Sequence, residues 1–526
     1  MMYFALQSPN VSSIWDYYAQ KSNKASLGLK TGSYWPRGKM LGGCTGNNGM
    51  VYVRGNDRDY NKWAEAGNPS WGWDNVLEYF KKSEGIQIAE LGTNLKHHNT
   101  KGPLKVGSYN NNAPIRDVFI NAGRELGYKI LNDYNADDKI GITYVHGIID
   151  GFRRSSTAKA FLVPNKDKPN LHVITNAHVI KLILDENKSA KGVEFILKNK
   201  KITAFTSKEV ILAAGAIGTP QIMMLSGIGP KEHLQQHSIR TLADLPVGFN
   251  LQDHVLVPFP LVFNKTKSVN ADDKAFLDVL HKYIHNQYTI FGHGMIDILG
   301  FFNTINETDK YPDIQMHSII FQRGERTMLP KFLDEILVYK DDLADSILKA
   351  NEDADILFIL LILLNPKSIG KVSLQSSDPF DYPLIDANYF ENIDDVNTFI
   401  RGIRIVHKFM ETNAFKEQEI EEVKVALPDC ALFTYGSDKY YDCYVRHLST
   451  TLYHPVGTAK MGPNNDKSAV VDSRLKVHGI KNLRVCDASI MPDIVSGNTM
   501  APVIMIAEKA SDFVKEDWGF KIDSEF

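Results

Sequence analysis

The residues of this sequence that could do chemistry concentrate between Ser449 and Ala510. His454 stands in the run Tyr-His-Pro-Val-Gly-Thr, and an imidazole, which titrates near neutral pH, suits the abstraction of a proton. Asn498 precedes an apolar stretch over 500–514 that predicts a helix, and asparagine is among the best residues for capping a helix N-terminus. The alternative for His454 is a structural histidine whose ring is satisfied by its neighbours.

A short apolar strand is predicted over 483–485, and it ends in Cys486-Asp487-Ala488. A strand that runs into an acid, followed by a Gly-Asn turn that feeds a helix N-terminus, is typical of an α/β protein that binds a charged cofactor. A second apolar run, over 210–215, ends in glycine and predicts a buried parallel strand. The alternative for Asp487 is a solvated acid at the end of its strand.

The segment from Gly38 to Gly55 is rich in glycine and asparagine. The backbone N–H groups of such a loop can converge on an anion or on a flat ring. Taken alone, the loop could also be an ordinary Gly-rich surface segment. Together with the strand, the turn and the helix described above, it predicts one wall of a cofactor site.

Three stretches, 38–55, 215–229 and 449–510, together resemble the glucose-methanol-choline (GMC) family of flavin-dependent oxidoreductases, and they occur in the order found in that family. The likeness extends from about Trp35 to Trp518. Within the family, the sequence resembles the insect glucose dehydrogenase-like branch through the runs TYVHG, RRSSTAKAFL, LPVGFNLQDH and KVHGIKNLRVCDASIMP.

The resemblance implies FAD as the cofactor, an alcohol or sugar as the CH–OH donor, and a quinone or oxygen as the electron acceptor. His454 matches the catalytic histidine of the family and would take the hydroxyl proton while hydride passes to flavin N5. Asn498 would hold the substrate oxygen. The positions that match cofactor-binding residues of the family are Gly42, Gly43, Thr45, Asn48, Gly49, Val51, Val179, Asp487, Ala488, Asn498, Thr499 and Pro502.

Three of these expectations can be stated at the level of single groups. The backbone of Val179 would contact the adenine, although a plain strand valine is an equal alternative. The Asp487 carboxylate would accept hydrogen bonds from ribityl hydroxyl groups. Gly457 would let the chain pass close to the flavin ring.

The implied fold is α/β, with an FAD-binding Rossmann-like domain, incomplete at its N-terminus, and an α+β substrate-binding domain built on an antiparallel sheet. Residues 1–60, 155–255 and 445–526 are assigned to the FAD-binding domain. Residues 61–154 and 256–444 are assigned to the substrate-binding domain. A chain of 526 residues is long enough for both.

Members of the family begin with a strand, a Gly-x-Gly-x-x-Gly turn and a helix, and no such unit occurs before Trp35. The runs Gly227-Ile-Gly229 and Gly292-His-Gly294 each lack the third glycine. We therefore expect this chain to lack the first nucleotide-binding element. One alternative function is accordingly a non-catalytic truncated paralogue or fragment that cannot hold FAD, and a further alternative is a hydroxynitrile lyase on the same fold.

Net charge, the length of apolar runs and cysteine content limit the classes of partner and the cellular compartments that fit this chain. A net charge of −3 excludes the basic footprint of a nucleic-acid-binding protein. The longest apolar run, 356–364, is much shorter than the roughly 20 residues of a membrane span. The N-terminus does not have the pattern of a secretory signal, although the branch that the sequence resembles is largely extracellular, so localisation stays open. Cys430 and Cys443 predict either a disulfide or two free thiols.

The last predictions from the sequence concern other polar residues and the remaining strands and helices. Asn250 and His254 are interpreted as polar contacts in an exposed loop, and His97 and His98 as solvated. An antiparallel pair is predicted over 171–183 and 190–197. Strands are expected over 314–321, 356–364 and 370–375, and helices over 276–288, 330–340 and 396–410.

Overall fold

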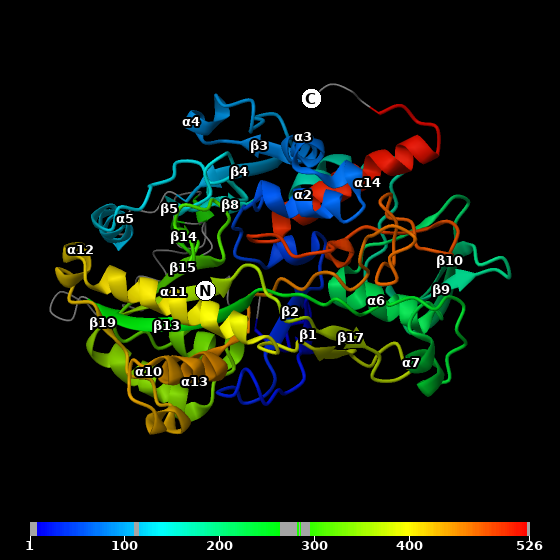
Figure 1. The fold of residues 1–526 in the computed structure, drawn as a ribbon. Coiled ribbons are helices and arrows are strands. Elements are labelled where there is room, and N and C mark those ends of the chain that lie inside the picture. Colours follow the sequence, from blue (N-terminus) through cyan, green and yellow to red (C-terminus); the bar gives the residue numbers. More distant parts are fainter. Residues whose placement is uncertain (1–7, 110–114, 264–280, 283, 286–294, 523–526) are drawn as a thin grey trace.

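The computed structural model describes residues 8–109, 115–263, 281–282, 284–285 and 295–522. Its largest element is a seven-stranded sheet with the order β19-β13-β16-β15-β14-β5, in which β20 also pairs with β13 (Figure 1). Every one of these pairings is antiparallel, as predicted for the substrate-binding part. The strands are β5 (Gly141–Tyr144), β13 (Val255–Phe263), β14 (Ile298–Phe302), β15 (Ile314–Phe321), β16 (Asp355–Leu363), β19 (Glu421–Glu422) and β20 (Thr450–Thr451).

The register of the central strands decides which side chains share a face. His317 of β15 is opposite Leu360 of β16, and Leu360 is opposite Pro258 of β13. Because side chains alternate along a strand, His317, Leu360 and Leu256 point to the same side, which we call the inner face. Helix α11 (Ile393–Met410) packs on the other side.

A two-stranded parallel sheet of β12 (Val210–Leu212) and β21 (Leu483–Val485) forms the second centre of the fold. Helix α6 (Gly215–Leu225) follows β12, and α14 (Met500–Asp517) comes after β21. Because the strands are parallel, their carboxyl ends meet at one edge, where the two helices begin. The apolar strands and the C-terminal helix were predicted at these places.

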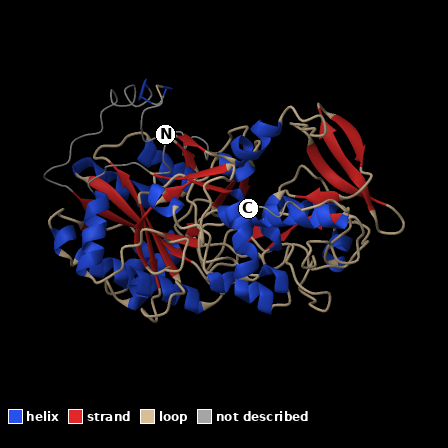
Figure 2. Ribbon diagram, turned by 90° about the horizontal axis from the view of Figure 1, so that it is seen from above, coloured by secondary structure: helices blue, strands red, loops and turns tan. Residues whose placement is uncertain are grey.

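A three-stranded antiparallel sheet lies at the opposite end of the molecule from the large sheet (Figures 1 and 2). It contains β9 (His178–Leu184), β10 (Ala190–Leu197) and β11 (Lys200–Phe205). The first two strands were predicted as a pair, and β11 was missed. The turn between β10 and β11 has positive φ angles at Lys198 and Asn199, 50° and 60°, as a tight two-residue hairpin requires.

The predicted helices of the second half have mixed outcomes. α11 contains the predicted helix over 396–410. The stretch 330–340 is broken into α9 (Met328–Lys331) and one π turn, Phe332–Ile336. The predicted helix over 276–288 lies almost wholly outside the described residues.

The disulfide Cys430–Cys443 is present and ties the turn at Pro428–Leu432 to α13 (Asp438–Leu448). Among the helices in the described part of the chain, none combines the length and apolar character needed to cross a bilayer.

The other elements are β1 (Ile14–Tyr18), β2 (Tyr34–Gly38), α2 (Asp57–Glu65), α3 (Trp73–Ser83), β3 (Glu84–Ile86), α4 (Ala89–Gly92), β4 (Leu104–Ser108), α5 (Ile115–Glu125), β6 (His146–Gly147), β7 (Ile149–Asp150), β8 (Arg153–Arg154), α7 (Lys231–Gln236), α10 (Asp341–Asp353), β17 (Lys371–Ser373), β18 (Leu384–Asp386) and α12 (Asn413–Lys416).

The assigned domain boundaries remain predictions. β5 and β20 lie in 61–154 and 445–526, and both pair with strands of 256–444. The pairing of β5 agrees with the assignment of 61–154 to the sheet-containing part. β20 reaches the same sheet immediately before His454, so the large sheet and the candidate site are joined at that point.

Candidate active site

A cavity of about 1490 Å³ lies where the glycine-rich loop, the starts of α6 and α14 and the inner face of the large sheet meet. This volume exceeds the roughly 300–1,000 Å³ of ordinary ligand pockets, so the cavity has room for a large ligand beside a small one. Pro502 does not line it and is buried in the first turn of α14. The other predicted site residues all line it: Gly42, Gly43, Thr45, Asn48, Gly49, Val51, Val179, His454, Asp487, Ala488, Asn498 and Thr499.

The glycine-rich loop is held in shape by side chains from the segment 154–157. The Arg154 guanidinium donates to the Asn48 carbonyl oxygen at 2.7 Å and to Asn48 Oδ1 at 2.8 Å. The Thr45 and Thr157 hydroxyl groups are 2.9 Å apart, and Thr45 Oγ1 also donates to the Gly42 carbonyl. The loop is therefore an ordered wall of the cavity. Arg154 was not predicted as a site residue, although it stands in the RRSSTAKAFL run.

Asp487 has a different role from the predicted one. Its Oδ2 accepts from the Gly215 amide at 2.9 Å and from the Thr219 hydroxyl at 2.6 Å. Its Oδ1 accepts from the amide and the hydroxyl of Ser489 at 2.8 and 2.6 Å. A carboxylate has about four lone-pair sites, and these four donors use them, so the side chain is not available to ribityl hydroxyl groups. Asp487 instead locks the end of β21 to the start of α6.

Asn498 does not cap α14, because the cap residue is Thr499 and it makes no side-chain capping bond. The Asn498 amide oxygen instead accepts from Gln315 Nε2 of β15 at 3.2 Å. This contact joins the cofactor-side loop to the inner face of the sheet, and it orients the amide at the cavity wall. Gln315 was not predicted, since no sequence motif marks it.

The backbone around His454 is fixed by a buried carboxyl group. The His454 amide donates to Asp253 Oδ1 at 2.8 Å, and the Tyr389 hydroxyl donates to Asp253 Oδ2. Burial raises the pKa of the Asp253 carboxyl to about 6, while these donors act in the opposite direction. Gly457 also lies against the Asn250 segment, because a Cβ there would lie 2.3 Å from the Asn250 carbonyl oxygen.

His254 contradicts the exposed-loop interpretation. It is fully buried, and its Nδ1 lies 2.9 Å from Nδ1 of His454, with the rings 5.1 Å apart and edge to face. His317 also lines the cavity. Burial, and then the charges that His254, Arg37 and His317 can carry, hold the pKa of His454 well below its usual value. Burial also lowers the pKa of His254 to about 4 and that of His317 to about 3. These imidazoles are therefore neutral at neutral pH.

The cavity walls fit an elongated anionic cofactor. α14 begins at the wall without a side-chain cap, and the N–H groups and dipole of such an end attract negative charge. The start of α6 also lines the wall, but its Gly215 amide already donates to the Asp487 carboxylate. Gly43 and Gly215 have φ angles of 52° and 78°, and a Cβ at either position would meet open space. The main chain is thus bare where a ligand could approach it closely.

Another histidine network lies in the part of the fold around β3 and corrects the prediction that His97 and His98 are solvated. His98 is buried, and its two ring nitrogens lie 2.9 Å from Glu84 Oε2 and 2.9 Å from Asp133 Oδ2. Arg54, fully buried, pairs with Glu84 at 2.8 Å. None of these side chains lines the cavity.

Comparisons with known proteins all indicate the same family. Family models described as GMC oxidoreductase match residues 22–256 and 366–507. Glucose dehydrogenase (FAD, quinone) of Drosophila melanogaster is 37% identical over 498 residues, which cover 93% of this chain and 76% of that protein. Ecdysone oxidase of Bombyx mori is 35% identical over 514 residues, or 96% and 74% of the two chains. The crystal structure of formate oxidase superimposes with a TM-score of 0.83 at 27% identity, covering 98% of this chain and 90% of that one.

Proposed function

Because the chain belongs to the GMC oxidoreductase family, we propose that it is an FAD-dependent oxidoreductase that oxidises the CH–OH group of an alcohol or sugar. The observation that carries the proposal is the single cavity shared by His454, Asn498 and the glycine-rich loop. FAD, when bound, supplies the isoalloxazine that accepts hydride from the carbinol carbon. The acceptor that then takes the electrons is proposed to be a quinone or oxygen.

The proposed cofactor contacts are mainly backbone groups. The bare main chain at Gly43 and Gly215 allows the cofactor a close approach, and the start of α14 suits the electron-rich edge of the ring system. The glycine-rich loop, held by Arg154, would lie along the ring. Val179 lines the same cavity and stays the proposed adenine contact. Asp487 is assigned to the shape of the site and not to the ligand.

His454 is proposed as the general base. A base must carry a lone pair at the working pH, and the lowered pKa of His454 keeps its ring neutral. Its side chain is partly exposed to the cavity, while its amide is held by Asp253. The proton of a substrate hydroxyl would pass to this ring as the carbinol hydrogen leaves.

His254 is proposed to decide which nitrogen of His454 is the base. The two Nδ1 atoms are in hydrogen-bond contact, so one must donate and the other accept. His254 Nε2 is buried and has no hydrogen-bond partner among the described residues, so its Nδ1 contact with His454 is the contact that bears on the tautomer of the pair. The proposed base role requires His454 Nδ1 to donate and His254 Nδ1 to accept in this contact. The lone pair of His454 is left at Nε2, the nitrogen that remains for the cavity.

Asn498 is proposed to hold the oxygen of the substrate. Its amide oxygen is already bound by Gln315, so its NH₂ group is the part left for a ligand. An NH₂ donor would stabilise the negative charge that grows on the oxygen as the proton departs. The base and the donor therefore have complementary tasks at one hydroxyl group.

Purified protein mixed with FAD tests the proposal. We expect a yellow protein whose flavin absorbance is bleached anaerobically by an alcohol or a sugar. A protein that stays colourless in excess FAD contradicts the proposal and supports a non-catalytic paralogue or fragment. A yellow protein that cleaves cyanohydrins but is never bleached by an alcohol or sugar supports the hydroxynitrile lyase alternative instead.

A further inference from the structure

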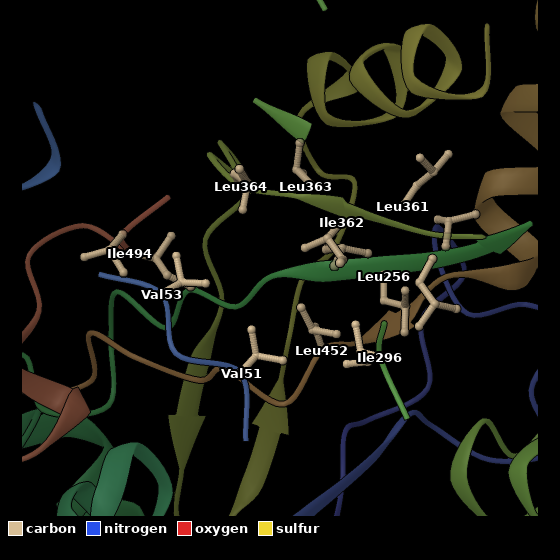
Figure 3. Close-up of a cluster of buried hydrophobic side chains, with 14 of the residues drawn as sticks. Val51, Val53, Leu256, Ile296, Leu361, Ile362, Leu363, Leu364, Leu452 and Ile494 are labelled. Atoms are coloured by element: carbon tan, nitrogen blue, oxygen red, sulfur yellow. The ribbon is translucent and has the colours of Figure 1, made fainter. Parts of the chain in front are cut away.

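The part of the cavity wall that the large sheet and its neighbouring turns supply is apolar. Among the described cavity-lining residues between 256 and 376, His317 is the single polar side chain. Figure 3 draws the buried cluster to which Leu256, Ile296 and Leu452 belong. We call this region the sheet-side chamber, and its apolar residues are Leu256, Ile296, Ile319, Phe332, Ile336, Leu337, Leu360 and Leu452.

The chamber adjoins the proposed catalytic residues. His317 and Ile319 lie on the same face of β15 as Gln315, which contacts Asn498. His317 is also close enough to His454 to lower its pKa. Leu452 stands two residues before His454 and lines the same cavity. A ligand whose hydroxyl group lies between His454 and Asn498 therefore has its carbon skeleton against these apolar side chains.

Few hydrogen bonds are available to a ligand in this chamber. His454 and Asn498 together satisfy one hydroxyl group. The ring nitrogens of His317 are buried and have no hydrogen-bond partner among the described residues, so this ring can bind one further oxygen. The several hydroxyl groups of a hexose need more partners than these, and each buried hydroxyl without a partner lowers affinity by about tenfold or more.

Resting on the proposed function, we propose that the substrate is a predominantly apolar alcohol and not a sugar, and that the sheet-side chamber selects it by enclosing its hydrocarbon skeleton. Apolar surface moved from water into such a chamber favours binding in proportion to its area. Ile319 is the residue whose side chain can be changed with the least disturbance to the catalytic pair, because it lies two positions beyond His317 on β15.

Binding and turnover are measured separately on the FAD-loaded protein. Cumyl alcohol has a hydroxyl group but no hydrogen on its carbinol carbon, so it reports binding without oxidation. We expect calorimetry to detect cumyl alcohol binding with a negative heat-capacity change, and glucose to bind at least about a hundredfold more weakly. We expect anaerobic bleaching of the flavin by benzyl alcohol and much slower bleaching by glucose.

A matched pair of variants locates the effect. Ile319→Thr replaces a chamber side chain by a smaller, polar, β-branched one and should weaken cumyl alcohol binding about tenfold. Ile320→Thr makes the same change on the opposite face of β15, does not alter the cavity wall, and should leave binding unchanged. Equal effects of the two substitutions on cumyl alcohol binding contradict the proposal.

The outcomes separate this inference from the proposed function. Bleaching by glucose but not by benzyl alcohol overturns the inference and leaves the proposed function standing. Binding of cumyl alcohol without bleaching by any alcohol supports the chamber and contradicts the oxidoreductase proposal. Failure of cumyl alcohol to bind, or glucose binding of equal strength, overturns the inference.

Discussion

His454 and His98 are both enclosed by protein, yet their nitrogens meet opposite kinds of partner. Nδ1 of His454 faces another imidazole, that of His254, and the groups that shift the pKa of His454, which are His254, Arg37 and His317, are all ones that can carry positive charge. The two nitrogens of His98 face the carboxylates of Glu84 and Asp133. Burial lowers the pKa of both rings, but in His98 the two carboxylates outweigh burial and raise it above its usual value.

The difference separates a chemical role from a structural one. A neutral ring with a lone pair can accept a proton, whereas a ring that donates from both nitrogens to carboxylates is a cationic cross-link. Arg54 belongs to the same cross-link, and together with His98 it holds the pKa of Glu84 below its usual value despite burial. Residue type alone therefore does not identify a catalytic histidine, and the charges facing the ring do.

The same substitution at both histidines gives the largest expected contrast. His454→Gln should slow anaerobic flavin reduction by about 10²–10⁴-fold while FAD stays bound, since a general base contributes this much. His98→Gln should leave the reduction rate of the folded protein unchanged, because its ring does not line the cavity. Stopped-flow absorbance measures both rates. Reduction at the parent rate in His454→Gln would remove His454 as the base.

Substitutions in the His98 cluster should instead have their main effect on the free energy of unfolding. Glu84→Gln leaves the Arg54 charge buried without its counter-ion and should lower the free energy of unfolding by about 3–5 kcal/mol. Glu78→Gln, which removes an exposed partner of Lys81, should cost less than about 0.5 kcal/mol. Urea unfolding followed by tryptophan fluorescence measures both. Similar losses in the two variants would mean that the His98 cluster is not a charged cross-link.

A substitution at Asp253 tests whether this residue supports catalysis by holding His454 in position. Asp253→Asn removes an acceptor from a buried set of donors and should cost about 1–3 kcal/mol of stability. We expect kcat to fall while KM changes little. Asp395→Asn removes a buried acceptor of the Lys367 and Ser368 amides, none of which lines the cavity, and should cost similar stability without a change in kcat. A parallel fall of kcat in both variants would assign the effect to general loss of structure.

The pH dependence of stability should have opposite signs at the two sites, and this is the smallest effect. His98 has a raised folded pKa, so its contribution is complete below about pH 6.5 and is lost as pH rises through that pKa. His254 has a folded pKa of about 4, so the parent protein loses stability as pH falls from about 6.5 towards that value.

Unfolding of the parent, His98→Gln and His254→Gln proteins between about pH 5 and pH 8 measures these slopes. The cost of His98→Gln should shrink as pH rises. The cost of His254→Gln should shrink as pH falls, since the variant lacks the buried ring that resists protonation. If the costs of the two substitutions changed with pH in the same direction, the proposed difference in protonation between His98 and His254 would be wrong.

Much of the site could be predicted because its motifs are local. The glycine-rich loop, the end of β21 at Cys486-Asp487-Ala488, the start of α14 and His454 follow from residue types at short spacing, and they line one cavity. The disulfide was one of two open readings and is present. β11 was missed because its turn, Lys198-Asn199, lacks the glycine that usually marks a tight hairpin.

What could not be predicted depends on contacts between distant segments. His254 was interpreted as exposed, and no local pattern indicates that it meets His454, 200 positions away. Gln315 lies in an apolar strand with no motif, and only the sheet register brings it to Asn498. Asp487 lines the cavity, but its partners Gly215 and Thr219 belong to another strand-helix unit and no local pattern predicted them.

The sequence by itself determined the family, the strands and helices that carry the motifs, and the identity of the proposed base and oxygen-binding amide, because these are properties of neighbouring residues. Only the tertiary structure decided that the proposed base is neutral, that its Nδ1 meets the ring of His254, and that the chamber beside it is apolar. Proton affinity and ligand fit depend on the solvent that is excluded and on the charges that face a group through space. Those quantities exist only after residues such as Asp253, His254 and His317 have been brought around His454 by folding.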